Sequence, residues 1–212
     1  MTPEKFWDMA APGFPKDEKR FEKINSIVIE KTNTYLKATD IVLDVGCGPG
    51  TKTIAFAGHV KHVLGIDISA KMIEMAEIKL ADHNFSNIEF RHTTLFDETL
   101  QKESFDVIMI FAVLHALEDQ QQVIQRITEL LKPGGLFISS TPCLKEKMDG
   151  LNTIKFSLFL LLLKFGLFPN ILTQFKFADL DRLLATEQLE IIETEALYDK
   201  ISSYFVAAKK NK

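Results

Sequence analysis

The sequence predicts an α/β protein whose sheet is doubly wound, has seven strands, is mostly parallel and ends in an antiparallel hairpin. Short apolar runs rich in Val, Ile and Phe alternate with helical stretches such as 70–81 and 121–131. Such alternation is typical of parallel strands that helices cover on both faces. The apolar runs lie at residues 41–45, 62–66, 88–91, 106–111 and 135–140. Two further runs, 189–196 and 204–208, are joined by a link too short for a crossover helix, so we expect an antiparallel pair.

The first apolar run leads directly into a glycine-rich turn. Glycines stand at every second position from 46 to 50, and residues 51–57 can form a helix after them. Glycine lets the main chain approach a bulky ligand and tolerates the positive φ of a sharp strand-to-helix reversal. The first amides of the helix face the same space. We therefore expect a small cofactor at this turn, in contact with Gly46, Cys47, Gly48 and Gly50.

A carboxylate ends the second apolar run. Asp67 stands at the tip of this strand, where an acidic side chain can accept both hydrogen bonds of a ribose diol. The alternative role for Asp67 is an N-cap for the helix that begins near Ser69. Dinucleotide sites need Gly-x-Gly-x-x-Gly, but here the third glycine comes one residue early and Asp44 precedes the first. A carboxylate there repels a pyrophosphate and suits a cofactor with an ammonium group, such as S-adenosylmethionine.

These motifs and three later ones resemble the signatures of the class I S-adenosylmethionine-dependent methyltransferases. The resemblance implies a Rossmann-like fold, S-adenosylmethionine as the cofactor and S-adenosylhomocysteine as its product. Within this class the chain looks most like the ubiquinone/menaquinone-biosynthesis-type small-molecule methyltransferases. The matching segments, in the family's order between residues 40 and 141, are 42–51, 65–72, 104–108, 113–115 and 130–135.

The resemblance implies further contacts with the cofactor. Ile68 and Met72 are expected to pack on the faces of the adenine ring. The family usually has an aspartate at the adenine edge, where this chain has Thr94, so we expect the Thr94 hydroxyl and the Leu95 amide to contact the ring. Asp97 is the alternative if this loop is shifted. Phe111, at the end of the fourth strand, is also expected at the cofactor.

The N-terminal segment carries an aromatic motif. Residues 6–14 are similar to the aromatic-Asp-x-x-Ala-x-x-aromatic stretch that often precedes these domains and folds over the cofactor. In that arrangement Trp7 and Phe14 exclude water from the sulfonium, which is favourably placed near aromatic faces. The alternative is an amphipathic helix that packs on the edge of the domain.

Methyl transfer from a sulfonium is a displacement in which proximity and alignment supply much of the acceleration. A catalytic base is therefore not obligatory. If the acceptor is a thiol, a phenol or an enol, His115, just beyond the fourth strand, is the best candidate for the base. The alternative is a histidine that caps or packs against the next helix.

An apolar insert follows the fifth strand. Residues 154–168 are apolar nearly all round, but the uncharged run between Lys155 and Lys164 has only eight residues. A transmembrane helix needs roughly 20, so the insert predicts a pocket wall, a dimer surface or a membrane-interface element with snorkelling lysines, in that order. The small acceptor is accordingly expected to be apolar or aromatic, and the protein to be a monomer or a homodimer.

Composition agrees with one domain. The 212 residues are 46% hydrophobic and 25% charged, and the net charge of −4 disfavours nucleic acid as a partner. The first 13 residues lack the apolar run of a signal peptide, so we expect a cytoplasmic protein. The two cysteines are not expected to form a disulfide, and no metal-ligand spacing is present. The expected regions are N-terminal cap helices (1–35), a cofactor-binding core (40–141), an apolar lid (145–176) and a last helix with the hairpin (177–212).

Two other functions are compatible with a nucleoside site. The first is a domain that binds S-adenosylmethionine as a sensor or partner subunit without turnover. The second is a nicotinamide-dependent reductase, which the glycine spacing, Asp44 and the lack of an evident Tyr-x-x-x-Lys pair disfavour.

Overall fold

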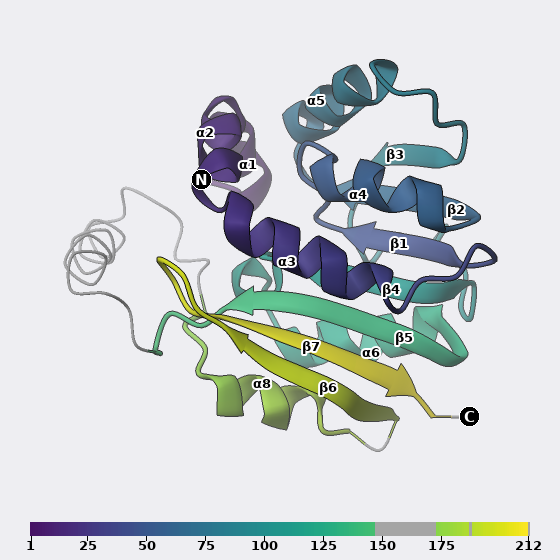
Figure 1. Cartoon of the computed structure of the whole chain (residues 1–212), viewed down its shortest axis with the longest axis vertical. Coiled ribbons are helices and arrows are strands. Elements are labelled where there is room, and N and C mark those ends of the chain that lie inside the picture. The colour runs from purple at the N-terminus through teal and green to yellow at the C-terminus, as the bar shows by residue number, and fades with distance from the viewer. Residues whose placement is uncertain (147–172, 187, 212) are drawn as a thin grey trace.

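The computed structural model describes residues 1–146, 173–186 and 188–211. Seven strands form one sheet in the order β3-β2-β1-β4-β5-β7-β6 (Figure 1). The predicted fold, a doubly wound sheet with an antiparallel hairpin, is confirmed. The strands are β1 (Ile41–Val45), β2 (His62–Asp67), β3 (Ile88–His92), β4 (Phe105–Phe111), β5 (Leu131–Pro142), β6 (Leu189–Leu197) and β7 (Ser203–Lys210).

The carboxyl ends of the parallel strands lie together at one end of the sheet. Strand β1 pairs in parallel with both β2 and β4, and β3 and β5 extend this parallel part on either side. This end of the sheet is where an open α/β sheet usually binds its ligand. Strand β7 runs antiparallel to both β5 and β6.

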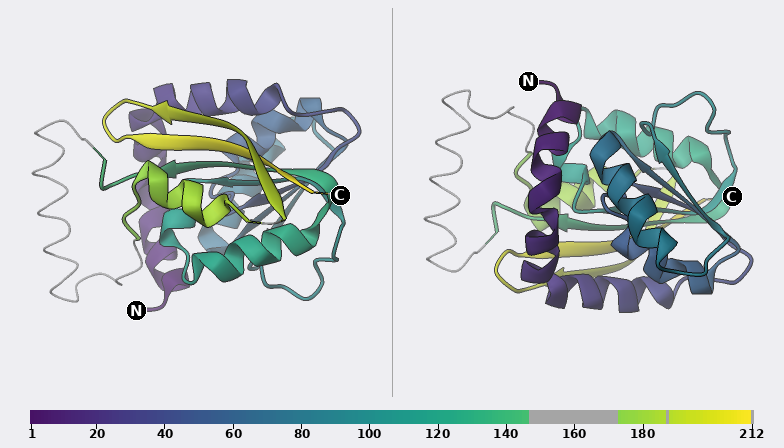
Figure 2. Two further views of the ribbon diagram at one scale, coloured as in Figure 1. Left: turned by 90° about the horizontal axis from the view of Figure 1, so that it is seen from below. Right: turned by 90° about the horizontal axis from the view of Figure 1, so that it is seen from above.

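Helices cover both faces of the sheet. Figure 2 shows α3 on one face and α6 with α8 on the other, while α1 lies along the edge where the parallel strands end. Helix α5 packs against β2 and β3. The α-helices are α1 (Pro3–Ala10), α2 (Phe14–Arg20), α3 (Glu22–Asn33), α4 (Thr51–Phe56), α5 (Ala70–Ala81), α6 (Gln120–Leu130) and α8 (Phe177–Leu184). Short 3-10 turns are η1 (Ala11–Gly13), η2 (Ala57–His59) and η3 (Leu114–Ala116).

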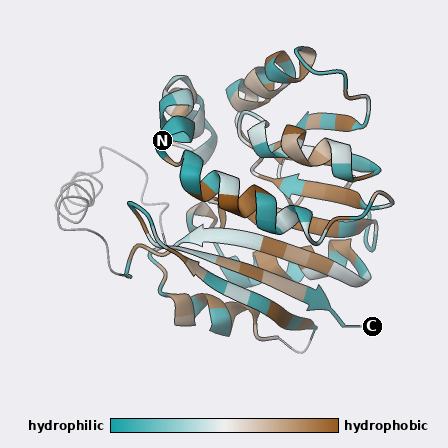
Figure 3. Cartoon of the chain, viewed as in Figure 1, coloured by the Kyte–Doolittle hydropathy of each residue, from teal (hydrophilic) through white to brown (hydrophobic). Residues whose placement is uncertain are grey.

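The sheet separates two hydrophobic clusters. Successive residues of a strand point to opposite faces, so Leu43 joins the cluster on the α6 and α8 side while Val42 joins the one on the α3 and α4 side. Because both faces of β1 and β4 are buried, their sequences read as nearly continuous apolar runs. Hydrophobic residues accordingly concentrate on the strands, whereas α1 and α2 are mostly hydrophilic (Figure 3).

The start of the fifth strand differs from the prediction. The sequence predicts a helix to residue 131 and a turn before a strand at 135, but β5 already begins at Leu131. Leu131 pairs with Phe105, and regular pairing then resumes from Leu136 opposite Val107, with a register shift between them. Gly134, with φ of 76°, provides the irregular backbone at this point. The glycine pair therefore forms an irregularity inside a strand and does not precede it.

The apolar insert of residues 154–168 lies outside the described residues. The described ends of the expected lid lie together, since the amide of Lys145 donates to the carbonyl of Phe175 at 3.1 Å. Within residues 1–146, 173–186 and 188–211, no helix has the length and apolar character needed to cross a membrane.

Candidate cofactor site

The glycine turn after β1 is held tightly against its neighbours. Gly46, Gly48 and Gly50 all have positive φ, at 69°, 54° and 74°. The amides of Gly46 and Cys47 donate to the carbonyl of Ile66 at 2.7 and 3.0 Å, which ties the turn to β2. A β-carbon on Gly50 would lie 2.6 Å from the Phe90 ring, so a side chain has no room there. The turn thus presents main chain, without side chains, at the carboxyl end of the sheet.

Asp67 joins this turn to the loop after β2. Its Oδ2 accepts a hydrogen bond from the Gly48 amide at 3.0 Å, and its Oδ1 accepts one from the Ser69 amide at 2.8 Å. Burial raises the pKa of Asp67, and these hydrogen bonds oppose that rise. Helix α5 is capped by Ser69, whose Oγ accepts from the Met72 amide at 3.2 Å, and not by Asp67. The Asp67 carboxylate is therefore oriented by two main-chain donors and keeps acceptor capacity for a ligand.

Asp44 is a second carboxylate near the turn, and it is only 2% exposed. The Thr53 hydroxyl, from the first turns of α4, donates to its Oδ2 at 2.6 Å. Burial raises the pKa of Asp44 to about 6. Burial also lowers the pKa of the neighbouring Lys52, an effect that the charge of Asp44 opposes. A cation brought to Asp44 would offset the burial of its charge, because attraction between opposite charges strengthens away from water.

The loop after β3 contains the residues expected at the adenine edge. Both oxygens of Asp97 are engaged within this loop: the Thr93 hydroxyl donates to Oδ2 at 2.7 Å and the Thr99 amide to Oδ1 at 2.8 Å. These hydrogen bonds lower the pKa of Asp97 to about 2. The Thr94 hydroxyl accepts from the Phe96 amide at 3.2 Å. Leu95 is buried, and its amide makes no hydrogen bond to any residue that the structure describes.

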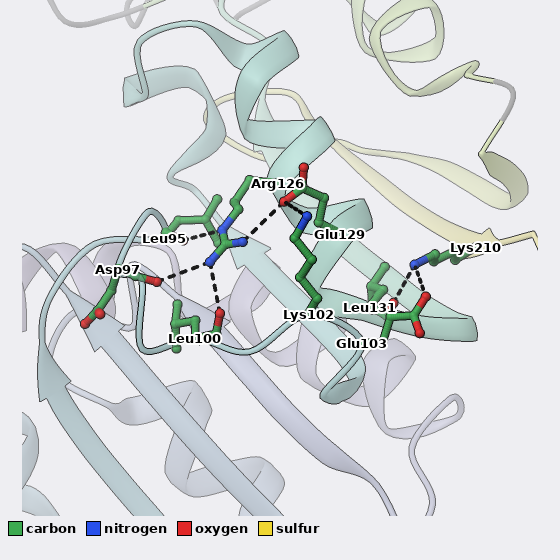
Figure 4. A network of polar contacts seen from close by, with 9 residues as sticks. All are labelled: Leu95, Asp97, Leu100, Lys102, Glu103, Arg126, Glu129, Leu131 and Lys210. Carbon is green, nitrogen blue, oxygen red and sulfur yellow. Dashed lines mark hydrogen bonds and ion pairs between the residues drawn. The ribbon is translucent and has the colours of Figure 1, made fainter.

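One side chain from α6 holds this loop in place. Arg126 donates to the carbonyls of Leu95, Asp97 and Leu100 at 3.3, 3.2 and 3.0 Å (Figure 4). Glu129 pairs with the same guanidinium at 3.3 Å. This role of Arg126 is not predicted from the sequence. The sequence holds no signal for it, because an arginine on an amphipathic helix is indistinguishable from a solvated one until the partner carbonyls are known.

Three more of the expected cofactor contacts, Ile68, Met72 and Phe111, lie in different surroundings. Met72 is 1% exposed in the first turn of α5. Ile68 is partly buried, and its carbonyl lies 2.9 Å from Nε2 of His92. Phe111 belongs to the cluster on the α3 and α4 side, where its ring lies 6.0 Å from that of Phe56.

His115 lies in η3, directly after β4. The residue is partly exposed, but its Nδ1 is buried and has no hydrogen-bond partner among the residues that the structure describes. Burial lowers the pKa of His115 to about 4, so its imidazole is neutral at physiological pH. Its main-chain carbonyl accepts from the Thr173 amide at 2.6 Å. The neutral ring has the protonation state that a base needs, although its lowered pKa makes it a weak one.

The N-terminal helices bring one of the two predicted aromatic residues to the turn. Cε1 of Phe14 lies 3.6 Å from the position of a β-carbon on Gly48. Trp7 packs edge-on against Phe6, with 5.1 Å between the ring centroids.

Neither cysteine takes part in a disulfide. Cys47 and Cys143 are free, buried thiols, and burial raises the pKa of both. Over residues 1–146, 173–186 and 188–211, no group of three or more His, Cys, Asp and Glu side chains is arranged to hold a metal ion.

In this sheet, a glycine turn follows the first strand and is hydrogen-bonded to a carboxylate at the tip of the second strand. This arrangement is typical of α/β proteins that bind a nucleoside cofactor. The sequence profile of the methyltransferase domain family matches residues 36–166. The chain belongs to this family, within the S-adenosylmethionine-dependent methyltransferases.

Curated relatives carry methyltransferase names. The uncharacterized methyltransferase YcgJ of Bacillus subtilis is 25% identical over 146 residues, which cover 66% of this chain and 58% of YcgJ. A ubiquinone biosynthesis O-methyltransferase of Actinobacillus pleuropneumoniae is 38% identical over 105 residues, covering 47% of this chain and 44% of the relative. The chain thus spans about half the length of the curated relatives that it matches.

Solved structures share the fold. The crystal structure of YcgJ superposes with a TM-score of 0.70 at 16% identity and covers 88% of this chain and 99% of its own. Phosphoethanolamine N-methyltransferase 2 of Haemonchus contortus, in complex with phosphomonomethylethanolamine and S-adenosylhomocysteine, superposes with a TM-score of 0.79 at 14% identity. That superposition covers 100% of this chain and 61% of the Haemonchus protein.

Proposed function

We propose that the chain binds S-adenosylmethionine and transfers its methyl group to a small apolar or aromatic acceptor. The observation that carries the proposal is the bridge from Gly48 to Asp67, at 3.0 Å, beside the buried carboxylate of Asp44. The residues present fit this cofactor: a β-carbon at Gly46 or Gly50 would collide with its neighbours, and Asp44 suits an ammonium group.

Each part of the cofactor has a candidate partner. Asp67 accepts from the ribose hydroxyls, and the carboxylate of Asp44 faces the ammonium group. Thr94 and the amide of Leu95 meet the edge of the adenine, whose faces pack on Ile68 and Met72. The remaining cofactor contacts in this proposal are Gly46, Cys47, Gly48, Gly50 and Phe111 around the turn, with Trp7 and Phe14 on the N-terminal helices.

The chemistry requires alignment more than it requires a catalytic group. S-adenosylmethionine, when bound, supplies an electrophilic methyl group on a sulfonium. The residues of the chain hold the two reactants in line and exclude water, which supplies much of the acceleration of a displacement. His115 takes a proton at Nδ1, which has no hydrogen-bond partner within the described part of the chain, if the acceptor must lose one.

The nature of the acceptor rests on sequence. Residues 154–168, an apolar segment outside the described residues, favour an apolar or aromatic acceptor. The name of the ubiquinone-biosynthesis relative agrees with an aromatic one. We propose that the insert closes the carboxyl-end crevice, which an open parallel sheet leaves exposed to water.

The lowered pKa of His115 favours a second candidate, a domain that binds S-adenosylmethionine without turnover. A weak base contributes little to the deprotonation of an acceptor, whereas a domain that only binds the cofactor needs no base.

Binding and turnover are separated by two measurements. Calorimetry with S-adenosylhomocysteine tests the cofactor site, and a screen with radiolabelled S-adenosylmethionine against quinols, phenols, thiols and amines tests transfer. We expect binding, and label in a quinol or phenol. Binding with no labelled product from any class supports the sensor, and binding of NADH in place of S-adenosylhomocysteine overturns both.

A further inference from the structure

The first two helices make several polar contacts with the rest of the described chain. We call residues 3–20, comprising α1, η1 and α2, the cap. No residue of α1 or α2 is buried, and in η1 only Ala11 is. Glu18 pairs with Lys79 of α5 at 3.3 Å, and Glu4 lies 3.6 Å from His92 at the end of β3. Because Ala11 is the one buried residue of α1, η1 and α2, these polar contacts contribute to holding the cap in place.

The shortest of these polar contacts joins α1 to the start of α5. The Ser69 hydroxyl donates to Oδ1 of Asp8 at 2.6 Å, and the Lys71 amide donates to the same oxygen at 3.3 Å. The first amides of a helix lack partners within the helix, and negative charge is favoured beside them. These hydrogen bonds, the one from Ser69 above all, lower the pKa of Asp8, so its carboxylate is charged at neutral pH. Figure 2 shows α1 along the edge where the parallel strands end.

Ser69 carries this contact onward to Asp67. It is completely buried, and each of its polar groups has a distinct partner. Its hydroxyl donates to Asp8 and accepts from Met72, while its main-chain amide donates to Oδ1 of Asp67 at 2.8 Å. Because a hydroxyl has one hydrogen, its use on Asp8 leaves the oxygen to accept from Met72. One buried residue, Ser69, therefore links the cap and the start of α5 to Asp67.

We propose that Asp8 is a positioning residue for the cofactor, which acts through Ser69 to hold the Asp67 carboxylate toward the ribose. The proposal rests on the proposed function, in which Asp67 is the ribose ligand. It couples two events: docking of the cap improves the ribose site, and a bound ribose improves docking of the cap. Such coupling is reciprocal by thermodynamic necessity.

The test is the affinity for S-adenosylhomocysteine, measured by calorimetry on the full chain. Asp8→Ala removes the carboxylate without weakening α1, because alanine is the best helix former. We expect affinity to fall about 5- to 30-fold, as for the loss of a charge-assisted hydrogen bond. Asp17→Ala is the matched control: Asp17 is an exposed carboxylate of the same cap whose side chain has no hydrogen-bond partner among the described residues, and we expect no change.

A double-mutant cycle distinguishes positioning from a merely structural role. In an Asp67→Ala background the ribose ligand is absent, so Asp8→Ala should weaken binding by less than about twofold more. Ser69→Ala should reproduce the effect of Asp8→Ala, and the two together should be no worse than either alone. Two outcomes would overturn the proposal: affinity losses of Asp8→Ala and Asp67→Ala that multiply in the double variant, or unchanged affinity in Asp8→Ala. Wild-type protein that fails to bind S-adenosylhomocysteine removes the proposed function itself.

Discussion

The side chain of Val113 fills the space that a β-carbon on Gly46 would need: its Cγ2 lies 2.5 Å from that position. Gly46 directly follows β1, whereas Val113 directly precedes η3, so the segment that carries His115 is packed onto the glycine turn. The position of the glycine turn and the position of the segment that carries His115 are therefore coupled through this contact.

Gly46→Ala should be strongly destabilising. The φ of 69° costs an alanine about 1 kcal/mol and the collision with Val113 about 1–3 kcal/mol more, so we expect the free energy of unfolding to fall by about 2–4 kcal/mol in urea titrations. Adding Val113→Ala to Gly46→Ala should recover part of the loss. Gly58→Ala is the control, because among the described residues no atom beyond its immediate chain neighbours lies within 4 Å of its β-carbon position. A double variant as unstable as the sum of the two single ones would contradict the packing argument.

Asp44→Asn should stabilise the ligand-free protein in a pH-dependent way. Burial raises the pKa of Asp44 to about 6 in the folded state, above its usual value of 3.8. The ionised carboxylate therefore lowers stability above pH 6, whereas near pH 4 and below it is protonated in the folded state and the cost disappears. We expect the free energy of unfolding to rise by about 2–3 kcal/mol near pH 7.5 and to change little near pH 4. Affinity for S-adenosylmethionine should fall in the same variant.

Asp199→Asn, at an exposed position, is the control for this comparison. Denaturant titrations of both variants at the two pH values suffice. A stabilisation of Asp44→Asn that persists at the lower pH would show that ionisation is not its cause.

If His115 is a base, His115→Ala should lower kcat about 100-fold and leave the affinity for S-adenosylhomocysteine unchanged. Because burial lowers its pKa to about 4, the imidazole stays neutral across the neutral range. The pH profile of kcat/KM should accordingly show no titration of this residue between about pH 6 and 8. His83→Ala, at an exposed site just after α5, should match the wild type. Unchanged turnover in His115→Ala leaves alignment as the whole mechanism.

Arg126→Ala should loosen the loop that follows β3. It leaves the carbonyls of Leu95, Asp97 and Leu100 without their donor, so we expect faster hydrogen exchange in this loop and a loss of about 1–3 kcal/mol in the free energy of unfolding. Affinity for S-adenosylhomocysteine should fall with it, if Thr94 and Leu95 contact the adenine. Arg182→Ala, whose side chain is 79% exposed, should change none of these quantities. Normal exchange in the loop of Arg126→Ala would show that other contacts hold it.

The sequence predicts the strands well because most of them are buried on both faces. The run at 41–45 coincides with β1, and the helix at 70–81 coincides with α5. The position of Asp67 beside the glycine turn also followed from sequence, since parallel strands end at a common edge. These features depend on local pattern and on the general geometry of parallel sheets.

Other features depend on partners that are distant in the chain. Arg126 reads as an ordinary surface charge and Asp8 as one residue of the aromatic motif at 6–14, and only the fold reveals that Arg126 holds the loop after β3 and that Asp8 accepts a hydrogen bond from Ser69. The start of β5 at Leu131 was missed for a related reason: Pro133, Gly134 and Gly135 read as a turn, whereas pairing with β4 tolerates them as an irregularity.

The order of the strands in the sheet also limits the order in which the strands can pair during folding. Strand β6 is made before β7, yet its only neighbour in the sheet is β7, which lies between it and β5. During synthesis β6 therefore has no sheet to join until Ser203–Lys210 has followed it. An isolated strand is not stable in water, so we expect these two strands to join the sheet together in a late step, with β7 pairing with β5 and β6 pairing with the other side of β7.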